Sequence, residues 1–195
     1  FPNMVVMAPG DAHDMTQMVD LAIQHSSPCS LRYPKASAGE LPGNRTPVKL
    51  GKAEVLHWGQ DGTILACGSL VTEALAASVL LRGEGLDVGV VNARFAKPID
   101  REIIHRALGD TGFLVTVEES MLMGGFGSAV LEVASEDGLA SENIRRLGIP
   151  DQFVEHGDRD ELPADLGLDA AGIARACRMV APASNADHKQ QHVVR

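Results

Sequence analysis

Residues 1–33, FPNMVVMAPGDAHDMTQMVDLAIQHSSPCSLRY, decide the fold class. The short apolar run from Met4 to Ala8 is typical of a strand that is buried on both faces. Apolar residues then recur at helical spacing from Ala12 to His25, behind an expected N-cap at Asp11. A second short strand is expected from Cys29 to Tyr33. Because a helical crossover joins parallel strands, this segment predicts a β–α–β unit.

The alternation of strands and helices resumes after residue 52. Short apolar runs predict strands at Ala53–Trp58, Thr63–Cys67, Val88–Val91, Phe113–Val117 and Ile144–Leu147. Helical spacing and capping residues predict helices at Leu70–Arg82, Ile99–Leu108, Gly125–Ser135 and Asp169–Val180. We therefore expect an α/β fold with a mostly parallel sheet and helices on both faces. The turn-rich stretch Gly59–Gly62 indicates a hairpin between the first two of these strands, with one of them antiparallel at an edge.

The spacing also predicts which helical residues face inward. In the first helix they are Met15, Met18, Val19, Ala22 and Ile23. In the helix from Leu70 they are Leu75, Val79 and Leu80.

Residues 34–47 lack hydrophobic periodicity and are punctuated by proline and glycine. We interpret them as a linker between domains. A long loop inside one domain is the alternative, and it is less favoured because structureless loops beyond about 12–15 residues are uncommon in compact domains. The polar residues 182–195 are expected to form a disordered tail.

Composition excludes several classes of protein. The 195 residues carry 17 Lys and Arg against 26 Asp and Glu, a formal charge of −9, which argues against a nucleic-acid partner. No apolar run is long enough to predict a membrane span. Cys29, Cys67 and Cys177 are scattered and fit free thiols in a reducing compartment, so we expect a cytoplasmic protein. The chain begins at Phe1 without an initiator methionine, which we interpret as a fragment of a longer polypeptide.

The turn Gly124-Gly125-Phe126-Gly127-Ser128 follows Glu118-Glu119 and opens a helix. Such a turn offers backbone amides to an anion. Tight packing of the helix on the sheet is the interpretation we favour, because the third glycine of a dinucleotide motif is missing and two carboxylates lie nearby. Adjacent strand residues point to opposite faces, so Glu118 and Glu119 are not expected to form a catalytic dyad.

Arg32-Tyr33-Pro34-Lys35 places two cations around a rigid proline at the end of a strand, which suits a phosphate contact. From spacing alone, a solvated strand end is favoured. His156, in the loop Ile149–Gly157, has the chemistry of a proton shuttle, but nothing near it in the sequence supplies a nucleophile.

Six segments resemble, in order, the C-terminal end of the 1-deoxy-D-xylulose-5-phosphate synthases, thiamine-diphosphate enzymes of the transketolase superfamily. They are PNMVVMAPGDAHDMTQM, LRYPKA, VVNARFAKPID, TVEESMLMGGFGSAVLE, RLGIPDQFVEHG and ADLGLDAAGIA. The resemblance implies that residues 1–36 close the pyrimidine-binding domain and that residues 37–47 are a linker. It further implies that residues 48–181 are the transketolase C-terminal domain.

The resemblance also implies an activity for the whole enzyme. These synthases join pyruvate to glyceraldehyde 3-phosphate with loss of CO₂, using thiamine diphosphate and Mg²⁺, in the route to isoprenoids, thiamine and pyridoxal. A homodimer is expected. The cofactor supplies the electron sink, and the protein orients and protonates.

One site residue is carried over by the resemblance. The last basic residue of the family's RYPRG segment contacts the aldehyde's phosphate, and Lys35 stands there, with Ala36 in place of the glycine. Lysine keeps the charge but lacks arginine's planar fork, so weaker phosphate binding is expected. Arg32 is a second candidate for this contact.

The family's Gly-Asp-Gly segment, which holds Mg²⁺ and diphosphate, is not in the sequence. The glutamate that activates the pyrimidine and the histidines of the cleft are also not in it. We therefore expect no catalytic, cofactor-binding or metal-binding residues in this chain and no turnover by the chain alone. The alternative is a free-standing, non-catalytic module that binds an anion at Gly124–Gly127 or acts as a regulator.

Overall fold

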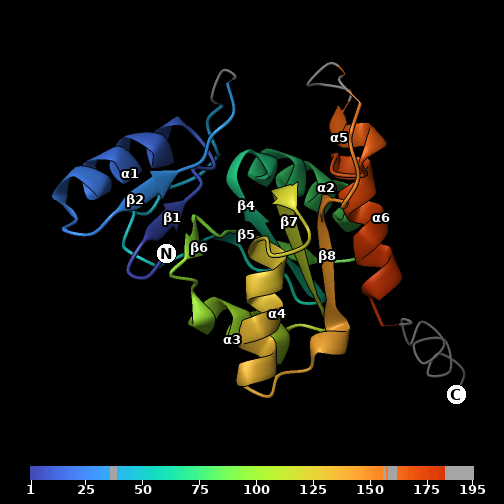
Figure 1. The fold of residues 1–195 in the computed structure, drawn as a ribbon. Coiled ribbons are helices and arrows are strands. Elements are labelled where there is room, and N and C mark those ends of the chain that lie inside the picture. The colour runs from blue at the N-terminus through green and yellow to red at the C-terminus, as the bar shows by residue number, and fades with distance from the viewer. Residues whose placement is uncertain (36–38, 156, 158–161, 183–195) are drawn as a thin grey trace, which may run out of the picture.

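Two β-sheets organise the chain (Figure 1). The structure, a computed structural model, describes residues 1–35, 39–155, 157 and 162–182. The strands are β1 (Val5–Met7), β2 (Cys29–Leu31), β3 (Glu54–His57), β4 (Gly62–Cys67), β5 (Val88–Asn92), β6 (Phe95–Lys97), β7 (Leu114–Met121) and β8 (Ile144–Ile149). The helices are α1 (Ala12–Gln24), α2 (Val71–Gly83), α3 (Arg101–Asp110), α4 (Phe126–Glu136), α5 (Leu162–Asp165) and α6 (Ala170–Val180), with short 3₁₀ turns at Gly68–Leu70 and Ser141–Asn143.

The predicted β–α–β unit is confirmed. Strands β1 and β2 are parallel, with Val5 opposite Cys29, and α1 connects them. Asp11 is the N-cap of α1, and its side chain accepts the N–H of Asp14 at 2.9 Å. A third strand, β6, comes from much later in the chain and pairs antiparallel with β1, where Met7 lies opposite Phe95. This unpredicted strand joins the first unit to the rest of the molecule.

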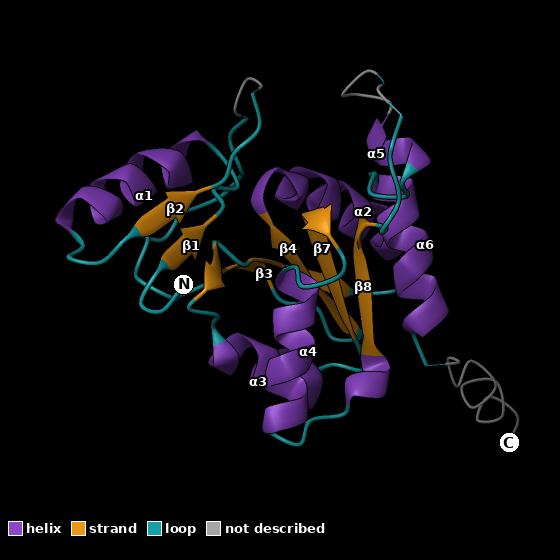
Figure 2. Cartoon of the chain, viewed as in Figure 1, coloured by secondary structure: helices purple, strands orange, loops and turns teal. Residues whose placement is uncertain are grey.

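The larger sheet has the order β3-β5-β4-β7-β8. All of its pairs are parallel except β3 with β5, so the single antiparallel strand lies at an edge. Helices α2 and α6 pack on one face and α3 and α4 on the other (Figure 2). The predicted α/β fold class is confirmed.

The predicted hairpin between β3 and β4 is wrong, because β5 lies between them. The connection at Gly59 crosses the start of β5 so closely that a Cβ there would collide with the backbone of Asp87 and Gly89. Asp61 then donates its N–H to Asp87 O at 2.9 Å. The glycine at residue 59 therefore serves a backbone crossing rather than a tight hairpin turn.

The predicted inward faces of two helices are also partly wrong. In α1, Met18 is buried but Ile23 is 77% exposed. In α2, Val79 is 66% exposed, and the buried residues are Val71, Ala74, Ala77, Ser78 and Leu81. Helix α2 packs against both the sheet and α6. Small residues on these two sides of α2 permit the close approach. Val79 lies on the remaining side of the helix, which faces solvent.

Among the described residues, no helix combines the length and the apolar character needed to span a bilayer. The expected disordered tail lies outside the described residues except for Pro182.

Candidate functional site

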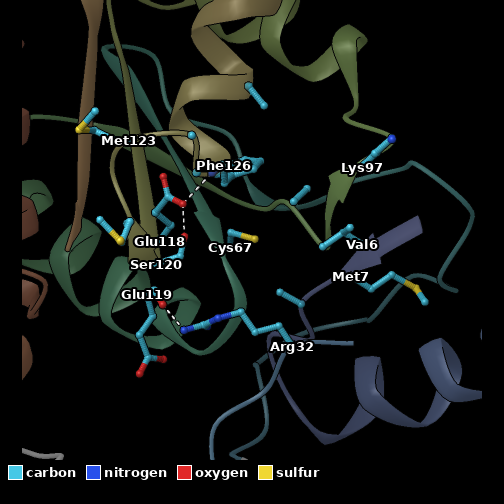
Figure 3. A pocket seen from close by; sticks show the side chains of 16 residues that line it. Val6, Met7, Arg32, Cys67, Lys97, Glu118, Glu119, Ser120, Met123 and Phe126 are labelled. Carbon is cyan, nitrogen blue, oxygen red and sulfur yellow. Dashed lines mark hydrogen bonds between the residues drawn. The ribbon is translucent and has the colours of Figure 1, made fainter. Parts of the chain in front are cut away.

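A cavity of about 420 Å³ opens between the small sheet and the end of β7 (Figure 3). The small sheet contributes Val6, Met7, Ala8, Arg32, Ala96 and Lys97 to its lining. The larger domain, by which we mean the five-stranded sheet and the helices that cover it, contributes Cys67, Glu118–Met121, Met123–Phe126 and Ala129. The carboxyl ends of β4 and β7 both reach this cavity, which is the edge where open parallel sheets bind ligands.

The side chain of Glu118, a residue of strand β7, lies at the N-terminus of helix α4. Its carboxylate accepts the N–H of Phe126 at 2.6 Å and the N–H of Gly127 at 2.7 Å, and the Ser120 hydroxyl also donates to it. Glu118 is 1% exposed. A carboxylate at this position satisfies amides that have no partner within the helix and lies at the positive end of the helix dipole. The protein therefore supplies its own anion at the glycine-rich turn.

The glycines of this turn permit close packing, as the sequence indicated. A Cβ at Gly127 would lie 2.6 Å from Thr116 Oγ1, and a Cβ at Gly125 would collide with the Glu118 carboxylate. The amides of Phe126 and Gly127 that an external anion would need are already bound. An external anion at this turn would have to displace the Glu118 carboxylate, which argues against an anion-binding module here.

We expect Glu118→Ala to lower the free energy of unfolding by about 2–3 kcal/mol, because buried donors are then left without an acceptor. Chemical denaturation of the two proteins measures this loss. Glu119→Ala is the control from the neighbouring position on the opposite face of β7, and its expected cost is below about 1 kcal/mol. Equal losses for the two variants would contradict the role of Glu118 as the acceptor at α4.

The side chains of Glu118 and Glu119 point to opposite faces, as expected for neighbours in a strand. Glu119 Oε2 accepts from the Ser69 hydroxyl at 2.8 Å on the α2 side. The Glu119 carbonyl accepts from the Arg32 guanidinium, which crosses from the small sheet (Figure 3). Arg32 is thus held at the rim of the cavity.

Lys35 lies elsewhere. It is exposed and does not line the cavity that Arg32 reaches. Its neighbours Tyr33 and Pro34 line a second cavity of about 350 Å³ beside the N-terminus of α1. The structure therefore does not bring the two predicted phosphate-binding residues into one cavity. His156 lies outside the described residues.

A buried cluster of five charged side chains, which the sequence did not reveal, joins the two parts of the chain. Its members are Asp11 and Asp14 from the β–α–β unit, Arg45 from the connecting segment, and Glu54 and Arg94 from the larger domain. Arg94 donates to Asp14 Oδ1 at 2.9–3.0 Å and to Glu54 Oε2 at 2.8 Å. Each of the five side chains is at most 9% exposed. The connecting segment is therefore fastened to both parts of the chain.

The cluster changes the acidity of its members. Burial alone would raise the pKa of Glu54, but hydrogen bonds from Arg45 and the Thr46 N–H, with the charges of Arg94 and Arg45, hold it below its ordinary value. Burial would lower the pKa of Arg45, but Glu54, Asp14 and Asp11 raise it. Both side chains are held in their charged forms, which is the condition for a stable buried ion pair.

Burial raises the pKa of the Cys67 thiol to about 12, with the charge of Glu118 adding to the shift and that of Arg32 opposing it. Burial likewise raises the pKa of Cys177 to about 12. Cys29 is half-buried, and the three thiols are free. The predicted free thiols are confirmed.

We expect Cys29 to react with iodoacetamide at pH 8 well before Cys67 and Cys177, because only thiolates attack and burial keeps the other two protonated. Mass spectrometry of peptides measures the order. The folded state holds these two protons more tightly than the unfolded chain, so stability should fall as the pH rises from about 9 to about 12. Rapid labelling of all three thiols in the folded chain would contradict this account.

Comparison with known proteins identifies the larger domain. The family described as "Transketolase, C-terminal domain" matches residues 51–173. The chain belongs to the transketolase C-terminal domain family. The matched residues include the parallel strands β5, β4, β7 and β8 and most of the four helices that cover them.

Individual relatives extend the match to the β–α–β unit. The chain is 49% identical over 181 residues to a 1-deoxy-D-xylulose-5-phosphate synthase of Rhodopirellula baltica and 47% identical over 181 residues to 1-deoxy-D-xylulose-5-phosphate synthase 2 of Geobacter sulfurreducens. These matches cover 93% and 91% of this chain but only 28% and 29% of the relatives. The chain thus spans less than a third of their length.

A solved structure has the same fold. It is described as "Split gene transketolase, inactive beta4 tetramer" and matches with a TM-score of 0.82 at 32% identity. The match covers 92% of this chain and 57% of that chain. The resemblance inferred from the six sequence motifs is confirmed at the level of the family and of the similarity to these synthases.

The described residues do not fit a thiamine diphosphate–Mg²⁺ site. The helix start that offers amides beside a glycine-rich turn is filled by Glu118, whose negative charge would repel a diphosphate. In the described part of the chain, no group of three or more His, Cys, Asp or Glu side chains has a metal-binding arrangement.

Proposed function

We propose that the chain is the C-terminal portion of a 1-deoxy-D-xylulose-5-phosphate synthase. The observation that carries this proposal is 45–49% identity to four such synthases over 90% or more of the chain. The complete enzyme condenses pyruvate with glyceraldehyde 3-phosphate: the carboxylate carbon of pyruvate leaves as CO₂, and its remaining two carbons join the aldehyde carbon. This makes the complete protein a transferase of the transketolase type in isoprenoid precursor synthesis.

The contribution of this chain to the reaction is binding rather than bond making. Lys35, at the exposed end of the β2 segment, supplies a positive charge for the phosphate of glyceraldehyde 3-phosphate. Arg32 assists by holding this segment against the larger domain through the Glu119 carbonyl. A charge on the protein that meets the substrate's phosphate lowers KM and orients the aldehyde for attack.

Thiamine diphosphate and Mg²⁺ are held by residues outside this chain in the complete enzyme, and the cofactor supplies the electron sink. The isolated chain is inactive. Support comes from the poor fit of its own residues to the cofactor and from the similar solved structure, which is itself described as inactive. The complete protein is a cytoplasmic homodimer that binds neither nucleic acid nor membrane.

The proposal is tested by incubating the complete gene product with ¹³C-labelled pyruvate, glyceraldehyde 3-phosphate, thiamine diphosphate and Mg²⁺. Mass spectrometry is expected to find labelled 1-deoxy-D-xylulose 5-phosphate and CO₂ in equal amounts. The isolated chain, assayed in parallel, should form neither product. A complete gene product that binds the cofactor but forms no pentulose phosphate would refute the assignment.

A further inference from the structure

The cavity between the small sheet and the end of β7 has the size of a small-molecule site. Its volume of about 420 Å³ lies within the range of about 300–1,000 Å³ that is usual for ligand pockets. The buried apolar residues of its lining are Met7, Ala8, Cys67 and Phe126, and we call them its floor. Met7 packs in the core of the small sheet, and the other three pack in the core of the larger domain. Because the floor is held from both sides, the cavity is formed before any ligand arrives.

The two carboxylates of the lining are engaged elsewhere, and their side chains point in opposite directions (Figure 3). Glu118 accepts two backbone N–H groups at the start of α4, which compensate its charge. The carboxylate of Glu119 lies on the α2 side, where it accepts from the Ser69 hydroxyl at 2.8 Å. Neither carboxylate therefore requires a cationic ligand in the cavity.

Arg32 supplies a positive charge at the rim of the cavity. In the described part of the chain, no carboxylate pairs with Arg32, whose side-chain hydrogen bond runs from Nη2 to the Glu119 carbonyl. Its other N–H groups are therefore available as donors to a ligand. The charge is felt at the floor, because burial and the charge of Glu118 raise the pKa of the Cys67 thiol and the charge of Arg32 opposes them. An anionic group is thus favoured on the Arg32 side of the cavity and disfavoured near Glu118.

We propose that this cavity binds a small amphipathic anion, whose apolar body lies on the floor and whose single anionic group pairs with Arg32. A polyanion such as a diphosphate does not fit, because the apolar floor gives it no hydrogen bonds in exchange for its lost hydration. Met121 and Met123 are exposed and line the mouth, and the flexible side chain of methionine adapts to apolar molecules of different shapes.

The ligand contacts both the small sheet and the larger domain, since both contribute to the lining. Its binding therefore stabilises the placement of the two parts against each other. The inference goes beyond the proposed function and does not depend on it.

Octanoate and 1-octanol are the probes, because they share an apolar chain and differ in charge. Calorimetric titration of the complete gene product is expected to show saturable binding of one octanoate per chain. Arg32→Met should weaken octanoate binding about tenfold, because the charge that meets the carboxylate is lost. The same variant should bind octanol within about twofold of the parent.

A second variant covers the case in which Arg32→Met does not fold. Met123 is 70% exposed at the mouth of the cavity, so Met123→Glu adds a negative charge there without burying it. It should weaken octanoate binding about threefold and leave octanol binding within about twofold of the parent. The matched control is Met179→Glu on α6, which adds the same charge at a residue that is 69% exposed and does not line the cavity. This control should bind both probes as the parent does.

The outcomes are distinct. Selective loss of octanoate binding in Arg32→Met and Met123→Glu, with Met179→Glu unchanged, supports the site. A complete gene product that shows no saturable octanoate binding would overturn it, as would binding that Arg32→Met and Met123→Glu leave unchanged. Equal weakening of both probes by Arg32→Met would also overturn it, because the arginine would then hold the shape of the cavity rather than recognise the anion.

Discussion

Arg94→Met should lower the free energy of unfolding by about 3–5 kcal/mol, which is the usual cost of removing one partner from a buried ion pair. Arg94 is 1% exposed and compensates Asp14 and Glu54 at once. Methionine fills much of the space. Arg45 is then the one arginine of the cluster left to balance the carboxylates of Asp14 and Glu54, and it already pairs with Asp11. Its backbone would inherit the positive φ of 61° that arginine already adopts, so backbone strain does not change greatly. Denaturant unfolding followed by circular dichroism measures the difference.

The control for this prediction is Arg101→Met, which removes an arginine from an exposed set of ion pairs with Asp137 and Glu136. Its expected cost is below about 1 kcal/mol, because water competes for exposed charges. If the two variants lose the same stability, the buried cluster does not hold the two parts of the chain together as we describe.

The cluster also predicts the direction of the acid response. The pKa of Glu54 is held below its ordinary value, so its stabilising contribution is complete above about pH 4.3 and is lost as the pH falls through the lowered pKa. Arg94→Met removes one of the charges that lower this pKa, so the variant should protonate Glu54 at a higher pH than the parent does.

If Lys35 binds the phosphate as we propose, Lys35→Met in the complete gene product should raise KM for glyceraldehyde 3-phosphate about 30-fold, because that charge is lost. Glyceraldehyde without the phosphate should be used equally well by the variant and the parent. Steady-state assays with both aldehydes measure the difference. Lys35→Arg should lower KM for the phosphorylated aldehyde, because arginine offers a bidentate fork.

An exposed lysine just after the connecting segment provides the control. Lys49→Met removes a charge of the same kind, and it should leave both aldehydes unaffected. A Lys35→Met variant that loses activity equally toward both aldehydes would show that Lys35 does not read the phosphate.

The order of strands and helices could be predicted because its signals are local. The apolar run at β1, the N-cap Asp11 and the break at residues 26–28 lie within one segment, and the structure confirms the β–α–β unit that they predict. The helix predicted over Asp169–Val180 is also present, as α6, and Asp169 is its N-cap. Local signals of this kind depend on sequence neighbours alone.

Strand order depends on partners that are distant in the sequence. The glycines at residues 59 and 62 are typical of a hairpin turn, yet β5, which begins at Val88, inserts between the two strands. The exposure of Val79 also depends on a distant partner. Helix α6, about a hundred residues further along the chain, packs on α2 and so decides which side of α2 is buried. No window of sequence around these residues contains the element that decides their packing.

The charged cluster escaped prediction for a related reason. Asp14 lies in the first turn of α1, where the sequence gives no sign of a distant partner, but in the structure it accepts hydrogen bonds from Arg45, Arg94 and Asn92. One signal was present in the sequence, since Arg94 follows the fully buried strand β5 after only one further residue. An arginine so close to a buried strand indicates that a buried carboxylate pairs with it, because an unpaired buried charge is costly. The sequence does not indicate which carboxylate this is.

We propose that this chain is part of a carbon–carbon-joining enzyme whose cofactor is held by other parts of the polypeptide. Calorimetric titration of the 195-residue chain with thiamine diphosphate in the presence of Mg²⁺ tests it most directly. The account predicts no heat of binding for this chain and clear saturable binding for the complete gene product. Tight, saturable binding of thiamine diphosphate by the 195 residues alone would contradict it.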